Sequence, residues 1–455
     1  MVKLTTYGGV FEIGGNKILL QDRGTRVFLD FGVSFSSEAK YFNGGIAARG
    51  VNGVGDYLEF DLLPRLEGLY AEEQIKPTTI PYKSPEYQGI LISHAHIDHV
   101  GHTDFLDESI PIYCGETCKR ILSALEESSA YKYNLASTRC FRTGDKIRID
   151  DIEIEPIHVD HSIPGAYGFI IHTSEGCVVY TGDLRVHGTA AHMTEDFISK
   201  AEGERPLVLL CEGTRVEQKE QHKLHSELEV RNNASEVVAN SSKLIATSFY
   251  GRDIDRLNTF YSIAVANHRK FAIPLKTALL LSKLKGDIHL KIPDVGHDDN
   301  VLIYKKRKKS GTYDKKDYFN WERQFLDTAV DHKWIHENQS KIILAIEPRD
   351  FTELIDIRPE AGGHFIYSMS EAYTEVEAVN DEVQKNWLNH FKIEFHQIHA
   401  SGHAPPEEIG MIIKRIKPKT VIPIHTEHPE KFQELIPKDS SRIVILRISE
   451  SYNMP

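Results

Sequence analysis

The sequence predicts an α/β protein in which one domain is interrupted by a second, inserted α/β domain and then completed. Over the first ~210 residues, short apolar or β-branched segments alternate with glycine-rich turns and helical stretches. The polar clusters that end these segments disappear after about Thr214 and return near Phe391. We therefore expect residues 1–213 and 391–455 to form one domain and residues 214–390 to form the insertion.

Six segments of the first part have the length and composition of buried strands. They are Arg26–Phe31, Gly89–Ser93, Ile152–His158, Gly168–His172, Cys177–Thr181 and Leu207–Glu212. Several end on or next to a polar residue, namely Asp30, His94, Asp183 and Glu212. Open α/β sheets place their binding sites at the carboxyl ends of strands, so these positions are candidate site residues.

The later part of the chain continues the strand–helix alternation. Lys243–Phe249, Ile342–Ile346 and Phe365–Ser368 are expected to be strands of the insertion, with a helix after Gly251. In the completing segment we expect a strand at Phe395–His399, a helix from about Pro406 to Ile416, and a strand at Val421–Ile424 that ends on His425.

Composition limits the class of protein. The chain has 455 residues, of which 40% are hydrophobic and 26% charged, as in ordinary globular proteins. Its five cysteines lack C-x-x-C spacing, and neither a signal peptide nor an apolar run of about 20 residues is present. These features predict a cytoplasmic protein with reduced thiols and no membrane association. The net charge of −12 does not exclude a polyanionic substrate, because binding depends on local patches.

The strongest motif is the run His94-Ala95-His96-Ile97-Asp98-His99, which places three imidazoles and a carboxylate within six residues. Imidazole and carboxylate together suit Zn²⁺ and Mn²⁺. One turn cannot complete the coordination of two ions, so further ligands must come from elsewhere. The candidates at expected strand ends are His161, Asp183 and His425, although an isolated histidine of this kind is also compatible with a structural hydrogen bond.

Several segments together resemble the β-CASP branch of the metallo-β-lactamase superfamily, and ribonuclease J within it, over essentially the whole chain. They are Gly8–Asn16 with Phe28–Asp30, the His94–His99 run, His161, Gly182-Asp183, Leu209–Glu212, His399–Ala404 and Ile424-His425. The resemblance implies a metallo-β-lactamase αββα sandwich with an inserted α/β β-CASP domain. It also implies two divalent metal ions, Zn²⁺ first, with Mn²⁺ or Mg²⁺ as alternatives. One ion would be bound by His94, His96, His161 and Asp183, and the other by Asp98, His99, His425 and the shared Asp183.

The resemblance also implies roles in catalysis. Two metal ions would supply a hydroxide nucleophile at neutral pH, with Asp98 part of the catalytic centre. His403 matches the proposed general acid of the family, and Glu212 matches the acid that supports its imidazolium form. The alternative for His403 is a turn histidine that only orders its loop.

Candidate substrate contacts follow from the same resemblance and from charge. Ser401 and Gly402 would bind a substrate phosphate, as in ribonuclease J, and Ser248, Arg252 and Arg256 resemble a phosphate-contacting turn. This turn reads Phe-Tyr-Gly-Arg-Asp and departs from the bacterial pattern. Lys305, Lys306 and Arg307 belong to a basic run that is either a track for backbone phosphates or a solvated loop.

The leading hypothesis is a metal-dependent ribonuclease that cleaves single-stranded RNA by hydroxide attack and leaves 5′-phosphate ends. The His399–Ala404 loop favours 5′–3′ exonuclease action, and endonuclease action stays open. The alternatives are a DNA nuclease of the same branch, disfavoured by His425, a small-molecule hydrolase, and a non-catalytic RNA-binding scaffold. A homodimer is one alternative for the oligomeric state.

Overall fold

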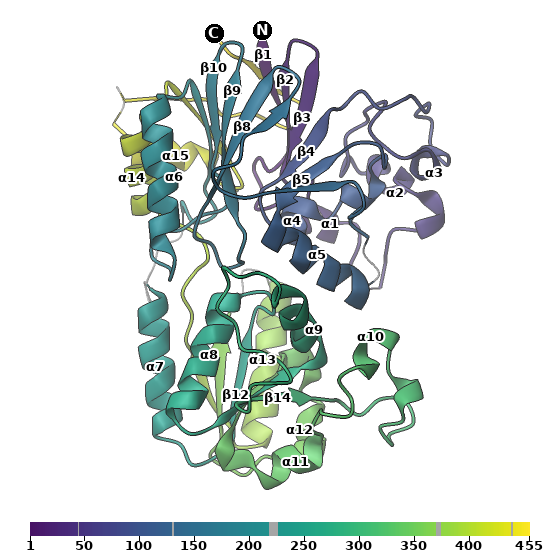
Figure 1. Cartoon of the computed structure of the whole chain (residues 1–455), viewed down its shortest axis with the longest axis vertical. Helices are drawn as coiled ribbons and strands as arrows, with labels where there is room; N and C mark the ends of the chain where they lie inside the picture. Colours follow the sequence, from purple (N-terminus) through teal and green to yellow (C-terminus); the bar gives the residue numbers. More distant parts are fainter. Residues whose placement is uncertain (44, 130–131, 218–225, 370–374, 438–439) are drawn as a thin grey trace. The chain divides into compact units, whose positions relative to one another are not determined.

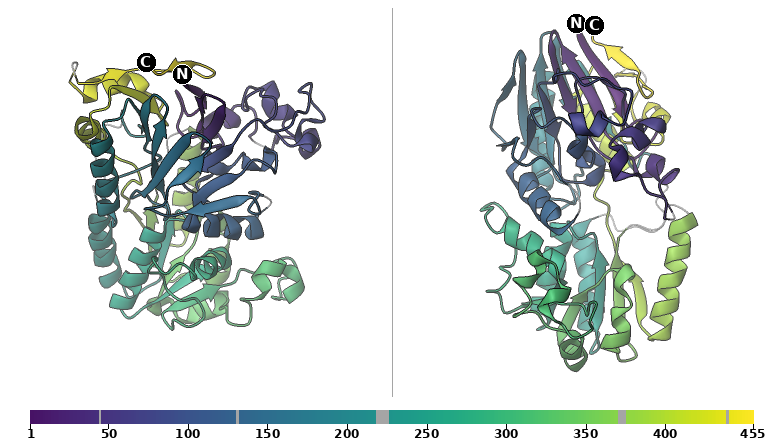
Figure 2. Two further views of the ribbon diagram at one scale, coloured as in Figure 1. Left: turned by 45° about the horizontal axis from the view of Figure 1, so that its top comes forward. Right: turned by 90° about the vertical axis from the view of Figure 1, so that its right-hand side faces the viewer.

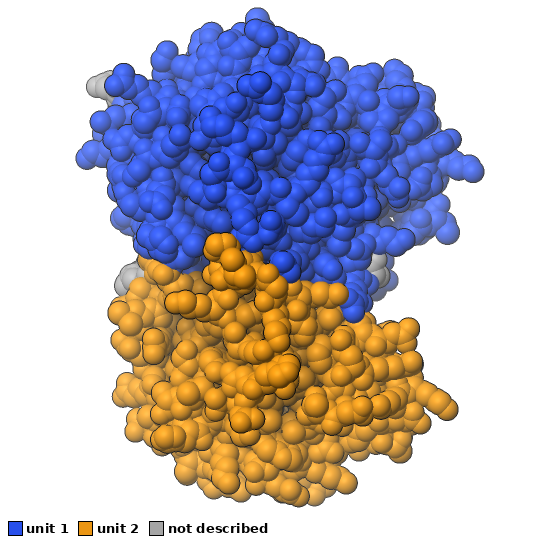
Figure 3. Space-filling model, viewed as in Figure 1, with its two compact units in different colours: residues 1–186, 190–219, 402–455 blue, residues 187–189, 220–401 orange. Residues whose placement is uncertain are grey.

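The computed structural model describes residues 1–43, 45–129, 132–217, 226–369, 375–437 and 440–455, with residues 375–380 described by their backbone alone. The chain forms two compact units, which Figure 3 shows in different colours. Unit 1 contains residues 1–186, 190–219 and 402–455, and unit 2 contains residues 187–189 and 220–401. Unit 2 is therefore an insertion in the chain of unit 1.

Unit 1 contains two seven-stranded sheets. The first has the order β20-β1-β2-β3-β4-β5-β6, and pairing of β1 with β20 brings the two ends of the chain side by side (Figures 1 and 2). Its strands are β1 (Val2–Gly8), β2 (Lys17–Asp22), β3 (Thr25–Leu29), β4 (Gly89–Ile92), β5 (Ile112–Gly115), β6 (Thr138–Phe141) and β20 (Ser451–Asn453).

The second sheet of unit 1 has the order β19-β18-β11-β10-β9-β8-β7. Its strands are β7 (Ile147–Ile149), β8 (Ile152–His158), β9 (Tyr167–Thr173), β10 (Gly176–Tyr180), β11 (Val208–Glu212), β18 (Thr420–Ile424) and β19 (Arg442–Ile443). The strands β10, β11 and β18 are parallel, and β8 and β10 are both antiparallel to β9. The carboxyl ends of β8, β10, β11 and β18 therefore lie at one edge of the sheet.

The two sheets of unit 1 pack face to face. Side chains of both, among them Leu20, Leu91, Phe169 and Ile422, form one buried apolar cluster. The outer face of the second sheet packs against α6 (Ala191–Glu204) and α14 (Pro406–Ile416), and α5 (Glu116–Ser128) packs on β5 and β6. Unit 1 is therefore an αββα sandwich, which confirms the predicted fold class. Its remaining helices are α1 (Phe35–Ala39), α2 (Gly55–Glu59), α3 (Glu72–Ile75), α4 (Ile97–Val100) and α15 (Phe432–Leu435).

Unit 2 has a six-stranded, entirely parallel sheet of order β14-β13-β15-β12-β16-β17. Its strands are β12 (Ile245–Phe249), β13 (Lys270–Pro274), β14 (Val301–Tyr304), β15 (Ile342–Ala345), β16 (His364–Ser368) and β17 (Glu394–Gln397). Its helices are α7 (Glu227–Ala239), α8 (Ile254–Ala266), α9 (Leu275–Leu284), α10 (Asn320–Arg323), α11 (His332–Glu337), α12 (Glu353–Ile357) and α13 (Glu375–His390).

The limits of the insertion differ from those expected from the sequence. The second limit falls after residue 401 and not after residue 390. The reason is β17, which we had expected to belong to the completing segment. It pairs with β16 at the edge of the sheet of unit 2, so this strand extends the insertion.

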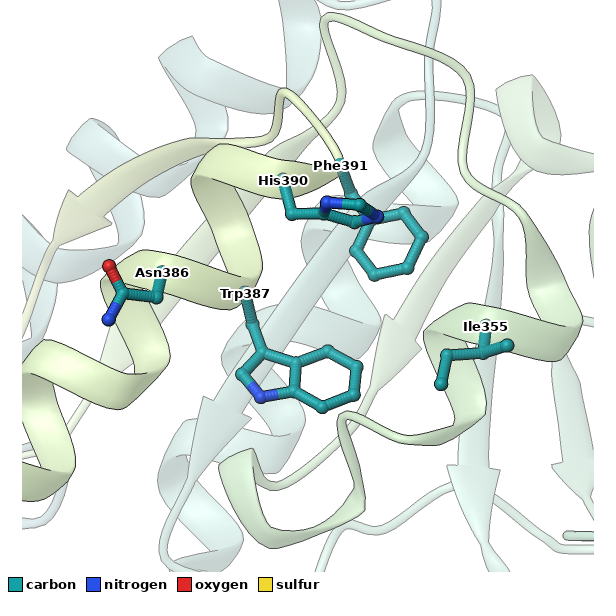
Figure 4. Close-up of a pocket in the computed structure, with 5 residues that line it drawn as sticks. All are labelled: Ile355, Asn386, Trp387, His390 and Phe391. Atoms are coloured by element: carbon teal, nitrogen blue, oxygen red, sulfur yellow. The ribbon is translucent and has the colours of Figure 1, made fainter.

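An apolar hollow of about 280 Å³ lies on the surface of unit 2. It is lined by Ile355 of α12, by three residues at the C-terminal end of α13, namely Asn386, Trp387 and His390, and by Phe391, which follows the helix (Figure 4). None of these is a candidate site residue. No helix in the part of the chain that the structure describes combines the length and the apolar character needed to cross a bilayer.

Candidate active site

The sheet topology explains why polar residues far apart in the sequence meet in unit 1. His161, Asp183 and His425 follow the carboxyl ends of β8, β10 and β18, and Glu212 is the last residue of β11. In the other sheet, β4 leads into the His94–His96 turn and α4, which carries Asp98 and His99. All seven expected metal ligands are brought together, in two groups that share Asp183.

The first group consists of His94, His96, His161 and Asp183. Nε2 of His94 lies 3.0 Å from Nδ1 of His96, which lies 3.2 Å from Nε2 of His161. Oδ2 of Asp183 lies 3.6 Å from His94 Nε2 and 3.9 Å from His161 Nε2. Four ligand atoms therefore converge on one point.

The second group consists of Asp98, His99, His425 and again Asp183. Nε2 of His425 lies 3.1 Å from Oδ2 of Asp98 and 3.6 Å from Oδ2 of Asp183. Nε2 of His99 lies 3.1 Å from the same Asp183 oxygen. The position of Asp183 between both groups is the one required of a carboxylate that bridges two cations.

Hydrogen bonds hold the imidazoles in the tautomer that metal binding requires. Nδ1 of His99 lies 2.7 Å from Oδ2 of Asp30 and donates to it, so Nε2 faces the site. Asp30 also accepts from the backbone N–H and hydroxyl of Ser93 and from the hydroxyl of Tyr180. Nδ1 of His161 donates to the carbonyl oxygen of Gly402 at 2.6 Å.

Two glycines approach Asp98 closely, and two other residues of the site have left-handed backbone angles. A Cβ atom on Gly14, whose φ is +79°, would lie 2.6 Å from Cβ of Asp98, and one on Gly32 would lie 1.8 Å from its carbonyl oxygen. Asp30 and His425 adopt φ values of 58° and 51° at their strand ends. Such left-handed conformations in residues other than glycine cluster at functional sites.

The protonation states of His161 and Asp183 favour metal binding. Burial lowers the pKa of His161 to about 3, and nearby His403 adds to this effect while Asp183 opposes it. Burial raises the pKa of Asp183, but the imidazoles of His425 and His99 outweigh it and hold the pKa well below its ordinary value. Neutral imidazoles and ionised carboxylates are the forms that bind cations.

Three carboxylates around His99 favour positive charge at the second ligand group. Burial alone would lower the pKa of His99, but Asp183, Asp30 and Asp98 outweigh burial and raise it well above its ordinary value. Nε2 of His99 and both carboxylate oxygens of Asp183 are buried, and apart from the 3.1 Å approach of Nε2 to Oδ2 they have no hydrogen-bond partner among the described residues. Buried polar atoms without partners are costly, so these atoms fit a site for divalent cations.

The candidate proton donor lies next to these groups. Nδ1 of His403 is 3.3 Å from each carboxylate oxygen of Glu212 and 4.0 Å from Oδ2 of Asp183. Glu212 is fully buried, whereas the side chain of His403 is 21% exposed. The imidazole therefore combines a buried carboxylate partner with access to solvent.

The structure shows one supporting residue, Thr214, that the sequence reasoning did not assign to the site. The hydroxyl of Thr214 lies 2.8 Å from Glu212 Oε2, 2.8 Å from Nδ1 of His425 and 3.1 Å from Nδ1 of His403. Thr214 stands two residues after the end of β11, which is the one sequence signal that could have identified it. Asp30, a candidate from its strand-end position, orients His99 as described above.

The residues expected to contact substrate have different surroundings. Gly402 belongs to unit 1, where a Cβ atom would lie 2.8 Å from Oγ of Ser162, and Ser401 belongs to unit 2. Ser248 is buried on β12, and its hydroxyl lies 3.7 Å from Sδ of Met369. The guanidinium of Arg252 lies 4.7 Å from the centre of the Tyr250 ring.

Arg256 is surrounded by protein partners, and phosphate binding by this residue stays a prediction. Its side chain is fully buried in unit 2 and forms an ion pair with Glu227 at 2.9 Å. It also donates to the carbonyl oxygens of Ser368 and Ala400. These buried partners hold the guanidinium in place within unit 2.

The three residues of the basic run, Lys305, Lys306 and Arg307, contact other residues of unit 2. Nζ of Lys305 donates to the carbonyl oxygen of Leu326, and Lys306 pairs with Asp350. Arg307 pairs with Asp356 at 2.8 Å. These contacts are local and compatible with a surface loop, and phosphate binding by the run stays a prediction.

Two family models match the chain. A β-lactamase superfamily domain matches residues 60–245, and a Zn-dependent metallo-hydrolase RNA specificity domain matches residues 390–445. The donor atoms of the two ligand groups and the match to a Zn-dependent metallo-hydrolase domain together indicate divalent metal ions.

Relatives named ribonuclease J align over most of the chain. The protein from Helicobacter pylori is 25% identical over 94% of this chain, and that from Thermus thermophilus is 23% identical over 94%. The chain spans 56% of the H. pylori relative and 68% of the T. thermophilus relative. The fold is shared with a crystal structure of a protein of unknown function from Enterococcus faecalis V583, with a TM-score of 0.76, 21% identity and 99% of each chain covered.

Proposed function

We propose that the chain is a metal-dependent ribonuclease of the β-CASP branch of the metallo-β-lactamase superfamily. The observation that carries the proposal is the pair of ligand groups that share Asp183, with His403 and Glu212 beside them. The RNA specificity domain and the ribonuclease J relatives support RNA as the substrate.

The proposed cofactor is a pair of divalent ions, with Zn²⁺ preferred because histidine nitrogens predominate among the ligands. His94, His96 and His161 would hold one ion, Asp98, His99 and His425 the other, and Asp183 both. When bound, two such ions lower the pKa of water and neutralise charge on a phosphoryl group. The chain's own contribution is a rigid set of donor atoms, held by Asp30, Thr214 and the carbonyl of Gly402.

Departure of the leaving oxygen requires a proton, and we assign it to His403. Nδ1 of His403 faces Glu212 and Thr214, so Nε2 would deliver the proton to the substrate. The buried Glu212 carboxylate stabilises the imidazolium that must form between turnovers. Cleavage in this way breaks the P–O3′ bond and leaves a 5′-phosphate.

Exonuclease action from the 5′ end is the proposed mode, with Ser401 and Gly402 as the phosphate-binding residues. In support, the carbonyl of Gly402 is bound by His161, so this loop is attached directly to a proposed metal ligand. A terminal phosphate held there would place the first phosphodiester at a defined distance from the ions.

The test is cleavage of 5′-labelled and 3′-labelled RNA and DNA by zinc-loaded protein. We expect labelled mononucleotide from the 5′ end of RNA, and at least a 1,000-fold slower reaction for Asp98→Ala/His99→Ala. The control is His289→Gln, which removes an exposed histidine of unit 2. Equal cleavage by the Asp98→Ala/His99→Ala variant would refute the site. Faster cleavage of DNA would identify a DNA nuclease, and RNA binding without cleavage would identify a scaffold.

A further inference from the structure

Three side chains of metal-binding type meet at the edge of the sheet of unit 2, outside the active site. They are His364 on β16 and Glu394 and His396 on β17. The two strands are parallel neighbours, with His364 opposite Glu394 and Ile366 opposite His396. Because alternate residues of a strand point to the same face, all three side chains lie on one face of the sheet.

Their donor atoms have the separations of ligands around a single cation. Nδ1 of His364 lies 3.0 Å from Nε2 of His396, and each of these nitrogens lies 3.6 Å from an oxygen of Glu394. In a tetrahedral zinc site with bonds of about 2.0–2.1 Å, neighbouring ligand atoms are about 3.3 Å apart. Donor atoms of the active-site groups in this same protein are separated by similar distances, such as 3.1 and 3.6 Å.

The cluster is both ordered by its strands and open to solvent. The side chains of His364 and His396 are 19% and 21% exposed, and that of Glu394 is 65% exposed. Since β17 is the last strand of the sheet, its outer side has no neighbouring strand. A cation could therefore reach the three donors from solvent, and water could complete its coordination.

We propose that His364, Glu394 and His396 form an accessory site for one divalent cation of the borderline class, Zn²⁺ above all, with water as the fourth ligand. This site is separate from the two ligand groups of unit 1 and does not depend on the proposed ribonuclease activity. The bound cation would link the edge strand β17 to β16 through side chains of both strands. The alternative is a hydrogen bond between the two imidazoles, which needs no cation.

The test is the zinc content of the protein at equilibrium. Metal-stripped protein is dialysed against micromolar Zn²⁺, and bound zinc is measured by mass spectrometry. We expect His364→Gln/His396→Gln to hold one zinc ion fewer per chain than the parent. The matched control is His289→Gln/His297→Gln, which removes two exposed histidines of unit 2 that lie outside the cluster and should leave zinc content unchanged.

A variant that lacks ligands of the active site distinguishes zinc bound at this accessory site from zinc bound in unit 1. Asp98→Ala/His99→Ala/Asp183→Ala should lose the zinc of unit 1 and retain one ion, and adding His364→Gln/His396→Gln should remove that ion. Glu394→Gln keeps both imidazoles and their hydrogen bond, and we expect it to weaken zinc binding at this site at least tenfold by calorimetric titration. Equal zinc content with and without the two histidines would overturn the proposal. If circular dichroism shows that His364→Gln/His396→Gln does not fold like the parent, the test rests on Glu394→Gln. Unchanged zinc affinity in Glu394→Gln would then overturn the proposal.

Discussion

A single hydroxyl group, that of Thr214, joins the proposed proton donor to the proposed metal ligands. It has one proton to donate and two lone pairs to accept with. The geometry is satisfied if it donates to Glu212 and accepts from Nδ1 of His425 and of His403. In that arrangement Nε2 of His425 carries no proton, so it and the Asp98 oxygen 3.1 Å away could both bind one cation.

We therefore expect Thr214→Val, which keeps the shape and removes the hydroxyl, to lower kcat for RNA cleavage by about 10–100-fold with little change in KM. Thr214→Ser restores the hydroxyl and should recover most of the activity. Steady-state kinetics of the two variants beside the parent measure this. A loss that is equal in both variants would contradict this prediction, because it would show that restoring the hydroxyl alone does not restore activity.

His102 makes stability depend on pH. Burial lowers its pKa to about 4, with Lys17 adding to the effect and Glu38 opposing it. The unfolded chain binds a proton at His102 below about pH 6.5, whereas the folded protein does so only below about pH 4. The contribution of His102 to the free energy of unfolding therefore falls as the pH is lowered from 6.5 to 4.

His102→Gln has no proton to bind in this window. We expect its free energy of unfolding to fall less than that of the parent between pH 6.5 and 4, by roughly 3 kcal/mol. Chemical unfolding of metal-free protein at several pH values measures the difference. Parallel curves for parent and variant would contradict the assignment.

At the scale of elements, Arg256 joins parts of unit 2 that are distant in the sequence. It lies on α8, pairs with Glu227 of α7, and donates to Ser368 at the end of β16 and to Ala400 just before the chain enters unit 1. The loop that leads to Ser401 and His403 is thus held from within unit 2 by a buried charge.

Arg256→Met should lower the free energy of unfolding by about 3–5 kcal/mol, because it leaves the Glu227 carboxylate buried without its partner. Replacing both residues, as Glu227→Leu/Arg256→Met, removes the unpaired charge and should recover much of this loss. Denaturant unfolding of the parent, the single and the double variant gives the coupling. A double variant that is less stable than Arg256→Met would contradict the prediction, because the unpaired Glu227 carboxylate would then not be the cause of the loss.

At the scale of the whole molecule, the two units have separate cores and should respond differently to metal removal. Cations that bind only the folded state stabilise it by about 4 kcal/mol when present at 1,000 times their Kd. For a unit of this size, chelation should lower the unfolding temperature of unit 1 by about 10 °C.

Scanning calorimetry with and without chelator, performed on His364→Gln/His396→Gln, measures this shift without the accessory site. We expect one transition to shift and the other to stay. Asp183→Ala identifies the transition of unit 1, because chelator should no longer move it in that variant. A shift of both transitions by the same amount would show that the units unfold together.

Much of the fold and of the candidate site follows from local sequence patterns. The αββα class was predicted from the resemblance, and the helix at residues 406–416 has isoleucines at helical spacing, all buried: Ile409, Ile412, Ile413 and Ile416. Of the seven expected ligands, four belong to the single His94–His99 motif, and His161, Asp183 and His425 were identified by their positions after expected strands. Strand ends are readable from a window of a few residues, and parallel topology gathers them at one edge.

Features that depend on pairing between distant segments could not be read in this way. The contacts of Thr214 with His403 and His425 span about 200 residues, and whether Arg256 lies at the surface or in a buried ion pair depends on how α7, α8 and β16 pack. The membership of β17 in unit 2, and with it the meeting of His364 and His396, depends on the register of two strands that are 30 residues apart. Sequence patterns carry the chemistry and the periodicity of each segment, but register and packing arise only when segments bury their apolar faces against one another.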